Sequence, residues 1–247
     1  MADGAHRFFP DTAHAIQPLG NEGILVLADS GIWLHDADTL ERLARLVEPP
    51  VGSMAVSSDA SLLAFSRHPR DLSEDAYKAY ETWVEIEIVS VPDLSPVARI
   101  SRVRPPFRME FSDDRRWLSA VSLGDDVMLA DLESGTRWRY EVPDPVYDGQ
   151  PLPGYPGYLA FVDSDDDFRV YRMEDGVEVF RDHRSANLWA LSVDSESGNV
   201  WVGGDDNDVH LLRMSTTGAD GPQFVDDGLI AALDDNVRAA ACCIGGT

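Results

Sequence analysis

The side chains that most often perform catalysis or bind metals are scattered along this sequence. Its histidines show no pair at the spacing of metal ligands, and it has neither a nucleophile elbow nor a phosphate-binding glycine loop. The six are His6, His14, His35, His68, His183 and His210. The only cysteines are adjacent, Cys242 and Cys243, in a segment patterned like a strand, which favours a buried thiol over a reactive one. These patterns predict no catalytic group, no cofactor and no tightly held metal.

Aspartates at alternate positions form the one pattern that could bind a cation. Asp163, Asp165 and Asp167 have the spacing of oxygen ligands in a calcium loop. No glycine follows at the sharp-turn position, and no glutamate stands at the distal ligand position. Aspartate also forms turns through its own side chain. A turn is therefore the preferred interpretation, and a calcium site is the alternative.

Arginine and aromatic side chains gather in one segment, residues 67–83, which contains the only lysine of the chain. The candidate binding residues are Arg67, Arg70, Tyr77, Lys78, Tyr80 and Trp83. Arg, Tyr and Trp concentrate binding energy at protein interfaces. The segment predicts a partner-binding loop, with one or two helical turns from Ser73 as its cap. A solvated loop folded over its own strands is the alternative.

A second candidate binding loop is rich in proline and tyrosine. It spans residues 143–157 and includes Tyr147 and Tyr155. The alternative interpretation is an innermost strand of the fold whose pattern is weakened by proline and glycine.

The net charge excludes several partners. Acidic residues outnumber basic ones 44 to 20, which gives a charge of −24. Such a surface repels phosphate backbones and anionic lipids, so we expect neither nucleic acid nor a membrane as partner. No apolar run is long enough to span a bilayer, and the absence of a secretory signal predicts a cytoplasmic protein. The acidity, with Lys78 as the single lysine, fits either a salt-adapted organism or a GC-rich genome.

Short apolar runs recur at a fixed spacing, each followed by a polar turn and an alternating apolar–polar run. This arrangement is typical of antiparallel strand hairpins. The alternating runs align on Leu34, Ile88, Leu129, Val170 and Leu211, at spacings of 54, 41, 41 and 41 residues. The first spacing contains an insertion of 13 residues, around 70–82. A period of about 41 residues with four strands per unit predicts the blades of a β-propeller.

The repeat predicts an all-β fold: a six-bladed propeller of four-stranded antiparallel blades, in a single domain over residues 1–247. Innermost strands are expected at 13–19, 53–58, 107–112, 147–152 and 188–194. The last blade is expected to be a composite of residues 229–245 and an N-terminal strand, 5–10, which would close the ring without exposed edges. A fragment of a larger propeller is the alternative. Only residues 71–82, and less clearly 38–46, show helical periodicity.

The fifth repeat resembles the WD-repeat family. It contains Asp182-His183, the apolar strand 188–194 and the strand–turn–strand pattern 200–213. The family pattern ends in Trp-Asp, which none of the repeats here contains, so the family's buried hydrogen-bond set is mostly absent. The resemblance covers nearly the whole chain in its period and implies a degenerate WD-repeat-like propeller, with a structural role for His183. It implies nothing about a ligand, because one fold hosts many functions.

Two functions from different classes remain. The first is a non-enzymatic interaction module that presents one loop face to a protein partner. The second is a channel-type enzyme or small-ligand binder, similar to lactonase-like or quinone-dependent propellers, which needs histidines or acids converging from the innermost strands. Those strands offer Glu110, Trp189 and, as a possible base, only His14. This scarcity favours the interaction module.

Overall fold

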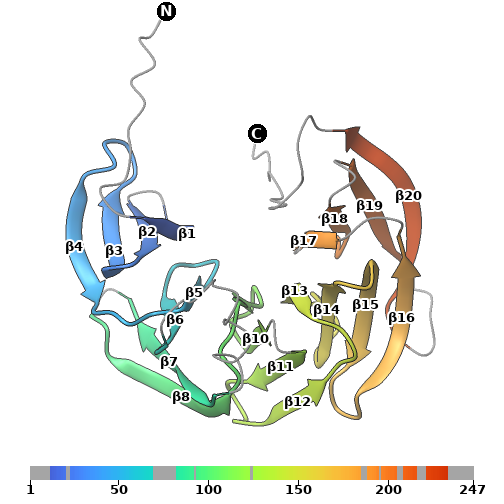
Figure 1. Ribbon diagram of the computed structural model, residues 1–247, viewed down its shortest axis with the longest axis horizontal. Helices are drawn as coiled ribbons and strands as arrows, with labels where there is room; N and C mark the ends of the chain where they lie inside the picture. The colour runs from blue at the N-terminus through green and yellow to red at the C-terminus, as the bar shows by residue number, and fades with distance from the viewer. Residues whose placement is uncertain are drawn as a thin grey trace, which may run out of the picture.

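The computed structural model describes residues 12–20, 23–68, 82–91, 93–122, 125–184, 188–194, 196–204, 208–215 and 221–232, and for residues 229–232 it describes the backbone alone. These residues form twenty strands in five four-stranded antiparallel sheets, each built from four consecutive strands. The sheets lie around a common centre (Figure 1), with the first strand of each sheet innermost and the fourth at the rim. The prediction of four-stranded blades is confirmed.

The first sheet comprises β1 (Ala13–Leu19), β2 (Gly23–Ala28), β3 (Gly31–Asp36) and β4 (Arg42–Val47). The second comprises β5 (Ser53–Val56), β6 (Leu62–Ser66), β7 (Val84–Ser90) and β8 (Pro96–Val103). The third comprises β9 (Arg108–Phe111), β10 (Trp117–Ser122), β11 (Asp126–Asp131) and β12 (Arg137–Glu141). The fourth comprises β13 (Val146–Pro151), β14 (Tyr158–Asp163), β15 (Asp167–Arg172) and β16 (Val177–His183). The fifth comprises β17 (Leu188–Val193), β18 (Val200–Gly204), β19 (Asp208–Ser215) and β20 (Gln223–Ala232).

The hydrophobic core lies between the blades. Four clusters of buried side chains each join two consecutive sheets; Ile86 and Ile88 of the second sheet, for example, share a cluster with Leu118 and Met128 of the third. Because both faces of a middle strand pack against other blades, all residues of β10 and β11 are buried. The outer strand β8 keeps an alternating, largely exposed pattern instead. The continuous apolar runs of the sequence correspond to second strands such as β10, and the alternating runs to third strands such as β11.

Aspartates hold the turns that connect the innermost strands to the second strands. In the second sheet, the Ser57 hydroxyl donates to Asp59 at 2.8 Å and accepts the Leu62 amide at 2.9 Å. In the third sheet, Ser112 repeats both bonds, with Asp114 and Trp117. Side-chain acceptors of this kind stabilise turns locally, so part of the aspartate content serves the fold itself.

The six-blade prediction is only partly met, because the described residues form five blades. Residues 229–232, predicted to begin a sixth blade, instead complete β20, where Leu229 pairs with His210 and Ala231 with Val209. The sequence places a break before Leu229, but Gly228 adopts a φ of 90° and its amide bonds to Asp226 at 2.7 Å, which makes a bulge within a continuous strand. Residues 5–10 and 233–245 lie outside the described part of the chain. A sixth blade therefore stays a prediction.

Two further expectations concern local structure. The proline-rich segment 143–157 contains the innermost strand β13, which confirms the alternative interpretation of that segment. The weak helical pattern at 38–46 was misleading: residues 42–47 form strand β4, and residues 37–39 lie in the turn before it. Hydrogen bonds to the Asp36 carboxylate from the Thr39 amide and hydroxyl, at 2.7 and 2.8 Å, fix that turn.

Candidate functional site

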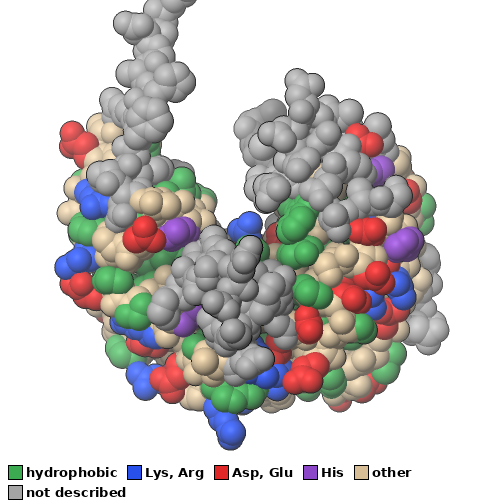
Figure 2. All heavy atoms as spheres, viewed as in Figure 1, with side chains coloured by type: hydrophobic (Ala, Val, Ile, Leu, Met, Phe, Trp, Pro, Cys, Tyr) green, Lys and Arg blue, Asp and Glu red, His purple; other side chains and the backbone are tan. Residues whose placement is uncertain are grey.

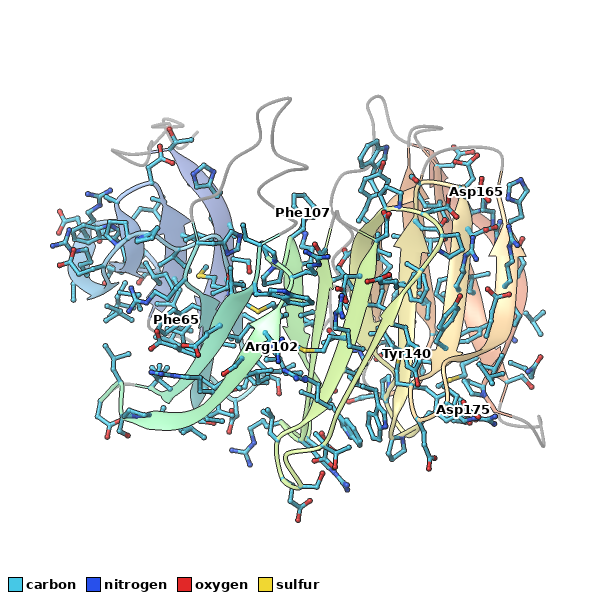
Figure 3. The ribbon with its side chains drawn as sticks, turned by 60° about the horizontal axis from the view of Figure 1, so that its bottom comes forward. Phe65, Arg102, Phe107, Tyr140, Asp165 and Asp175 are labelled. Carbon is cyan, nitrogen blue, oxygen red and sulfur yellow. The ribbon has the colours of Figure 1, made fainter. Side chains whose placement is uncertain are left out.

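The loop insertion of the sequence joins β6 to β7, at the end of the blades where β12 also connects to β13. We call this end of the blades the upper face. In Figure 3, Phe107 and Asp165 lie towards the upper face, and Asp175 lies at the opposite, lower end. Of the predicted binding residues, Arg70, Tyr77, Lys78 and Tyr80 lie outside the described residues. Their place in a binding face stays a prediction.

Trp83 lies at the junction of the second and third blades. Its side chain is 48% exposed. The guanidinium groups of Arg104 and Arg139 lie 4.6 and 4.7 Å from the centre of its ring. Trp83 is therefore held by cation–π contacts at the surface and is not packed into the core of its own blade.

A buried carboxylate fixes the two arginines that contact Trp83. The Asp126 side chain is 4% exposed; it accepts a hydrogen bond from Nε of Arg139 at 2.6 Å and lies 4.0 Å from Arg104. Burial raises the pKa of Asp126, while Arg139 and Arg104 oppose that rise. The result is an ordered arrangement of one aromatic ring, two cations and one acid on the upper face.

The remaining predicted binding residues divide between different places. Arg67 is bound within the first two blades, because its guanidinium donates to Glu87 at 3.1 Å and to the Glu48 carbonyl at 2.7 Å. Tyr147 begins β13 on the upper face and packs against Trp189, with 4.2 Å between ring centres. Tyr155 follows the same strand at its other end and packs edge-on against Tyr158. The two tyrosines therefore lie at opposite ends of β13, and a part for either in a binding face stays a prediction.

Arginine side chains pair with the aspartates of the alternative calcium site. Arg169, whose side chain is 6% exposed, lies 2.7 Å from both Asp163 and Asp167, and Arg181 also pairs with Asp167. The Asp163 carboxylate accepts the amides of Asp165 and Asp167, as a turn-forming aspartate does. Within the described ranges, no three His, Cys, Asp or Glu side chains are placed to hold a metal ion.

Pairing of this kind is widespread at the surface. On the face shown in Figure 2, basic and acidic side chains lie next to one another around much of the rim. The structure therefore spreads its few arginines among many carboxylates, and an arginine without a carboxylate partner is a departure from this pattern.

Sequence reasoning missed part of the central channel. The channel has a volume of about 530 Å³ and is lined from all five innermost strands. It contains Arg108, Glu110 and Asp148; of these, only Glu110 was expected. Burial, together with Asp148, raises the pKa of Glu110 to about 8, and burial also raises the pKa of Asp148. The signal for Asp148 was weak because its strand, β13, carries glycine and proline.

Polar side chains of the channel also form hydrogen bonds that stabilise the fold. Asp148 accepts the Leu191 amide at 3.3 Å, and Gln150 accepts the Val193 amide at 3.1 Å. These bonds join β13 to β17 across neighbouring blades. His14 lines the channel, but its ring bonds to Asp29 at 2.6 Å. The described walls thus combine a protonated acid with fixed polar groups and contain no paired nucleophile and base.

The sheets and their repeat define a WD-repeat-like β-propeller, as the sequence predicted. Among solved structures, the β-propeller domain of Cps50 (Swd1) from Myceliophteria thermophila has a TM-score of 0.63 at 10% identity, covering 90% of this chain and 74% of that chain. The RRP9 WD40 repeats have a TM-score of 0.63 at 15% identity, covering 83% of this chain and 61% of that chain. This chain thus spans less than two thirds of the RRP9 chain. At such identities the likeness establishes the fold alone.

No family model and no curated protein sequence matches the chain. No helix among the described residues is long and apolar enough to cross a membrane.

Proposed function

We propose that this protein is a non-enzymatic interaction module, which binds a protein partner through the upper face of the propeller. The observation that carries the proposal is the exposed Trp83, held between Arg104 and Arg139. Trp and Arg contribute more than most residues to the binding energy of protein interfaces. A side chain that is already ordered loses little conformational entropy when a partner covers it.

The position of Trp83 supports the same proposal. It follows directly after the 13-residue insertion, the largest departure from the 41-residue period. Insertions in connecting loops are a common place for binding residues. The WD-repeat-like fold of the solved neighbours is consistent with a scaffold that binds proteins.

The proposal is tested by capture of partners from an extract of the native organism. The immobilised wild-type protein is compared with Trp83→Ala and with Leu43→Ala, which removes another exposed apolar side chain, on β4. We expect one specific partner, identified by mass spectrometry, whose affinity falls at least about tenfold in Trp83→Ala and is unchanged in Leu43→Ala. Equal capture by all three proteins would refute the role of Trp83.

The insertion itself requires a separate variant. Arg70, Tyr77 and Tyr80 are replaced together by alanine, and binding of the same partner and the melting temperature are measured. Lost binding at an unchanged melting temperature supports a docking loop. Lost stability, or binding that stays the same, shows that these side chains serve the blade instead.

A second candidate is a small-ligand binder that uses the central channel. The observation in its favour is the 530 Å³ channel with the protonated Glu110 in its wall. A thermal-shift screen of small metabolites against wild type and Glu110→Gln tests it. Stabilisation of the wild type that the variant loses would support this function over the interaction module.

A further inference from the structure

A groove of about 420 Å³ lies at the rim of the propeller between the second and third blades. One wall is the middle of β8, and the other is the turn between β11 and β12. Ala98, Ile100 and Leu132 line it and pack against the core cluster that joins the two blades. The groove therefore has a fixed, apolar floor, and neither Trp83 nor its two arginines line it.

Arg102 stands on one side of this groove in an unusual backbone conformation. Val84 pairs with Val103, and Glu85 pairs with Ser101, so Arg102 is the extra residue of a bulge in β8. Its φ is 58°, and of the seven non-glycine residues with positive φ it alone lies inside a strand. A bulge redirects the side chain that it carries, and a left-handed arginine is sterically unfavourable. Figure 3 labels Arg102 beside β8.

Arg137 stands on the opposite side. Its guanidinium donates to the Ser101 carbonyl of β8, which fixes its position without neutralising its charge. No described carboxylate forms an ion pair with either Arg102 or Arg137. The acid that lines the groove, Asp131, is already paired with Arg116 at 2.8 Å, and Glu133 in the turn of the wall lies 3.7 Å from the same arginine.

Two unneutralised arginines on one groove are unexpected in a chain with a charge of −24. Elsewhere the arginines of the described blades mostly have carboxylate partners, as Arg115 does with Asp59 and Arg172 with Asp175. We propose that this groove binds an extended acidic segment of a partner protein, with its carboxylates on Arg102 and Arg137 and an apolar side chain on the floor between them.

The chemistry of the groove favours this occupant over a nucleic acid. Each guanidinium presents a planar fork of donors that matches a carboxylate. A phosphate backbone needs many cations, and the net charge of −24 on the whole chain would repel it. A short peptide with a few acids avoids most of that repulsion. The inference holds whether or not the upper face binds a partner.

The test uses fluorescence polarisation with a fluorescein-labelled decapeptide in which aspartates alternate with leucine and threonine. A second decapeptide carries asparagine in place of each aspartate. We expect the full-length protein to bind the acidic peptide and not its neutral counterpart, with an affinity that falls as sodium chloride is raised. Each of Arg102→Ala and Arg137→Ala is expected to weaken binding about fivefold, as for exposed charge pairs of this strength.

Matched variants separate binding from folding. Arg102→Gly removes the guanidinium but adopts the positive φ without strain, so it keeps the bulge and the melting temperature while weakening binding equally. Arg213→Ala removes another exposed arginine, on β19, and leaves binding unchanged. Trp83→Ala also leaves it unchanged.

The proposal is overturned if both decapeptides bind equally, or if the acidic peptide binds equally to wild type and to the Arg102→Ala, Arg137→Ala double variant. Displacement of the acidic peptide by single-stranded polyuridylate at matched charge concentration would show a general polyanion site, which also overturns it.

Discussion

Replacement of Glu110 by glutamine is expected to stabilise the protein at alkaline pH and to have little effect near pH 4.5. The Glu110 side chain lines the central channel, where burial, Asp148 and, more weakly, Asp113 raise its pKa from an ordinary 4.5 to about 8. Arg108 opposes this shift. Glutamine has the shape of the protonated acid and cannot ionise, so it removes the cost of charging this position.

The sign follows from proton uptake. The folded protein keeps the Glu110 proton up to a pKa of about 8, whereas the unfolded chain releases it near 4.5. Glu110 therefore favours the folded state below pH 4.5, and this contribution is lost as the pH rises towards 8. The full difference in pKa corresponds to about 5 kcal/mol, and because the side chain is partly reached by solvent we expect about 1–3 kcal/mol.

Thermal denaturation of wild type and Glu110→Gln between pH 4.5 and pH 9 measures this effect. For a chain of this size, the expected gain in melting temperature at pH 9 is roughly 3–10 °C. Glu174→Gln, an exposed substitution in the turn between β15 and β16, serves as the control and should change little. A melting-temperature difference between wild type and Glu110→Gln that is constant over the whole pH range would refute the reasoning, because it would show that the acid is ionised or hydrated in the folded channel.

Three further predictions follow from the blades and from the net charge. Arg169→Ala leaves Asp163 and Asp167 buried without this cation, so the free energy of unfolding, measured with denaturant at pH 7, should fall by about 3–5 kcal/mol. The exposed Arg213→Ala should lower it by less than about 0.5 kcal/mol, and equal losses would contradict the pairing. Gly31→Ala should lower the melting temperature, since Gly31 has a φ of 115° and a Cβ there would lie 2.1 Å from the Val47 carbonyl oxygen, and an unchanged melting temperature would disprove this close approach. The melting temperature should rise from low to molar sodium chloride because salt screens repulsion among the 44 acidic residues, and a flat or falling curve would indicate that genome composition explains the acidity.

The positions of the strands that pack against neighbouring blades could be predicted closely from the sequence. The predicted bounds of the innermost strand β1 match the structure to the residue, because its apolar side chains recur with the period of the blades. The end of the chain shows the limit of this reasoning. Asp226 and Gly228 have the composition of a turn, but the long partner strand β19 continues to pair beyond them, and the turn becomes a bulge.

Side-chain contacts between strands and between blades could not be predicted from the sequence. Arg67 was predicted to face a partner, but Glu87 and the Glu48 carbonyl, some twenty residues away on either side, hold it within the fold. Arg102 carries no local signal for its bulge, since arginine is not a residue that favours positive φ. Both cases depend on geometry between strands, which the spacing of residue types does not encode.

The departures from the repeat converge on one junction. The insertion enters the second blade between β6 and β7, Trp83 follows it and contacts two arginines at the third blade, and the Arg102 bulge lies one strand further out. Neither Trp83 nor Arg102 belongs to the core cluster between the two blades. A regular blade would be more stable without the strained arginine and without neighbouring unneutralised cations. The concentration of these costs at a single junction supports both proposed interaction surfaces, and we expect substitutions in the second and third blades to separate binding from stability most clearly.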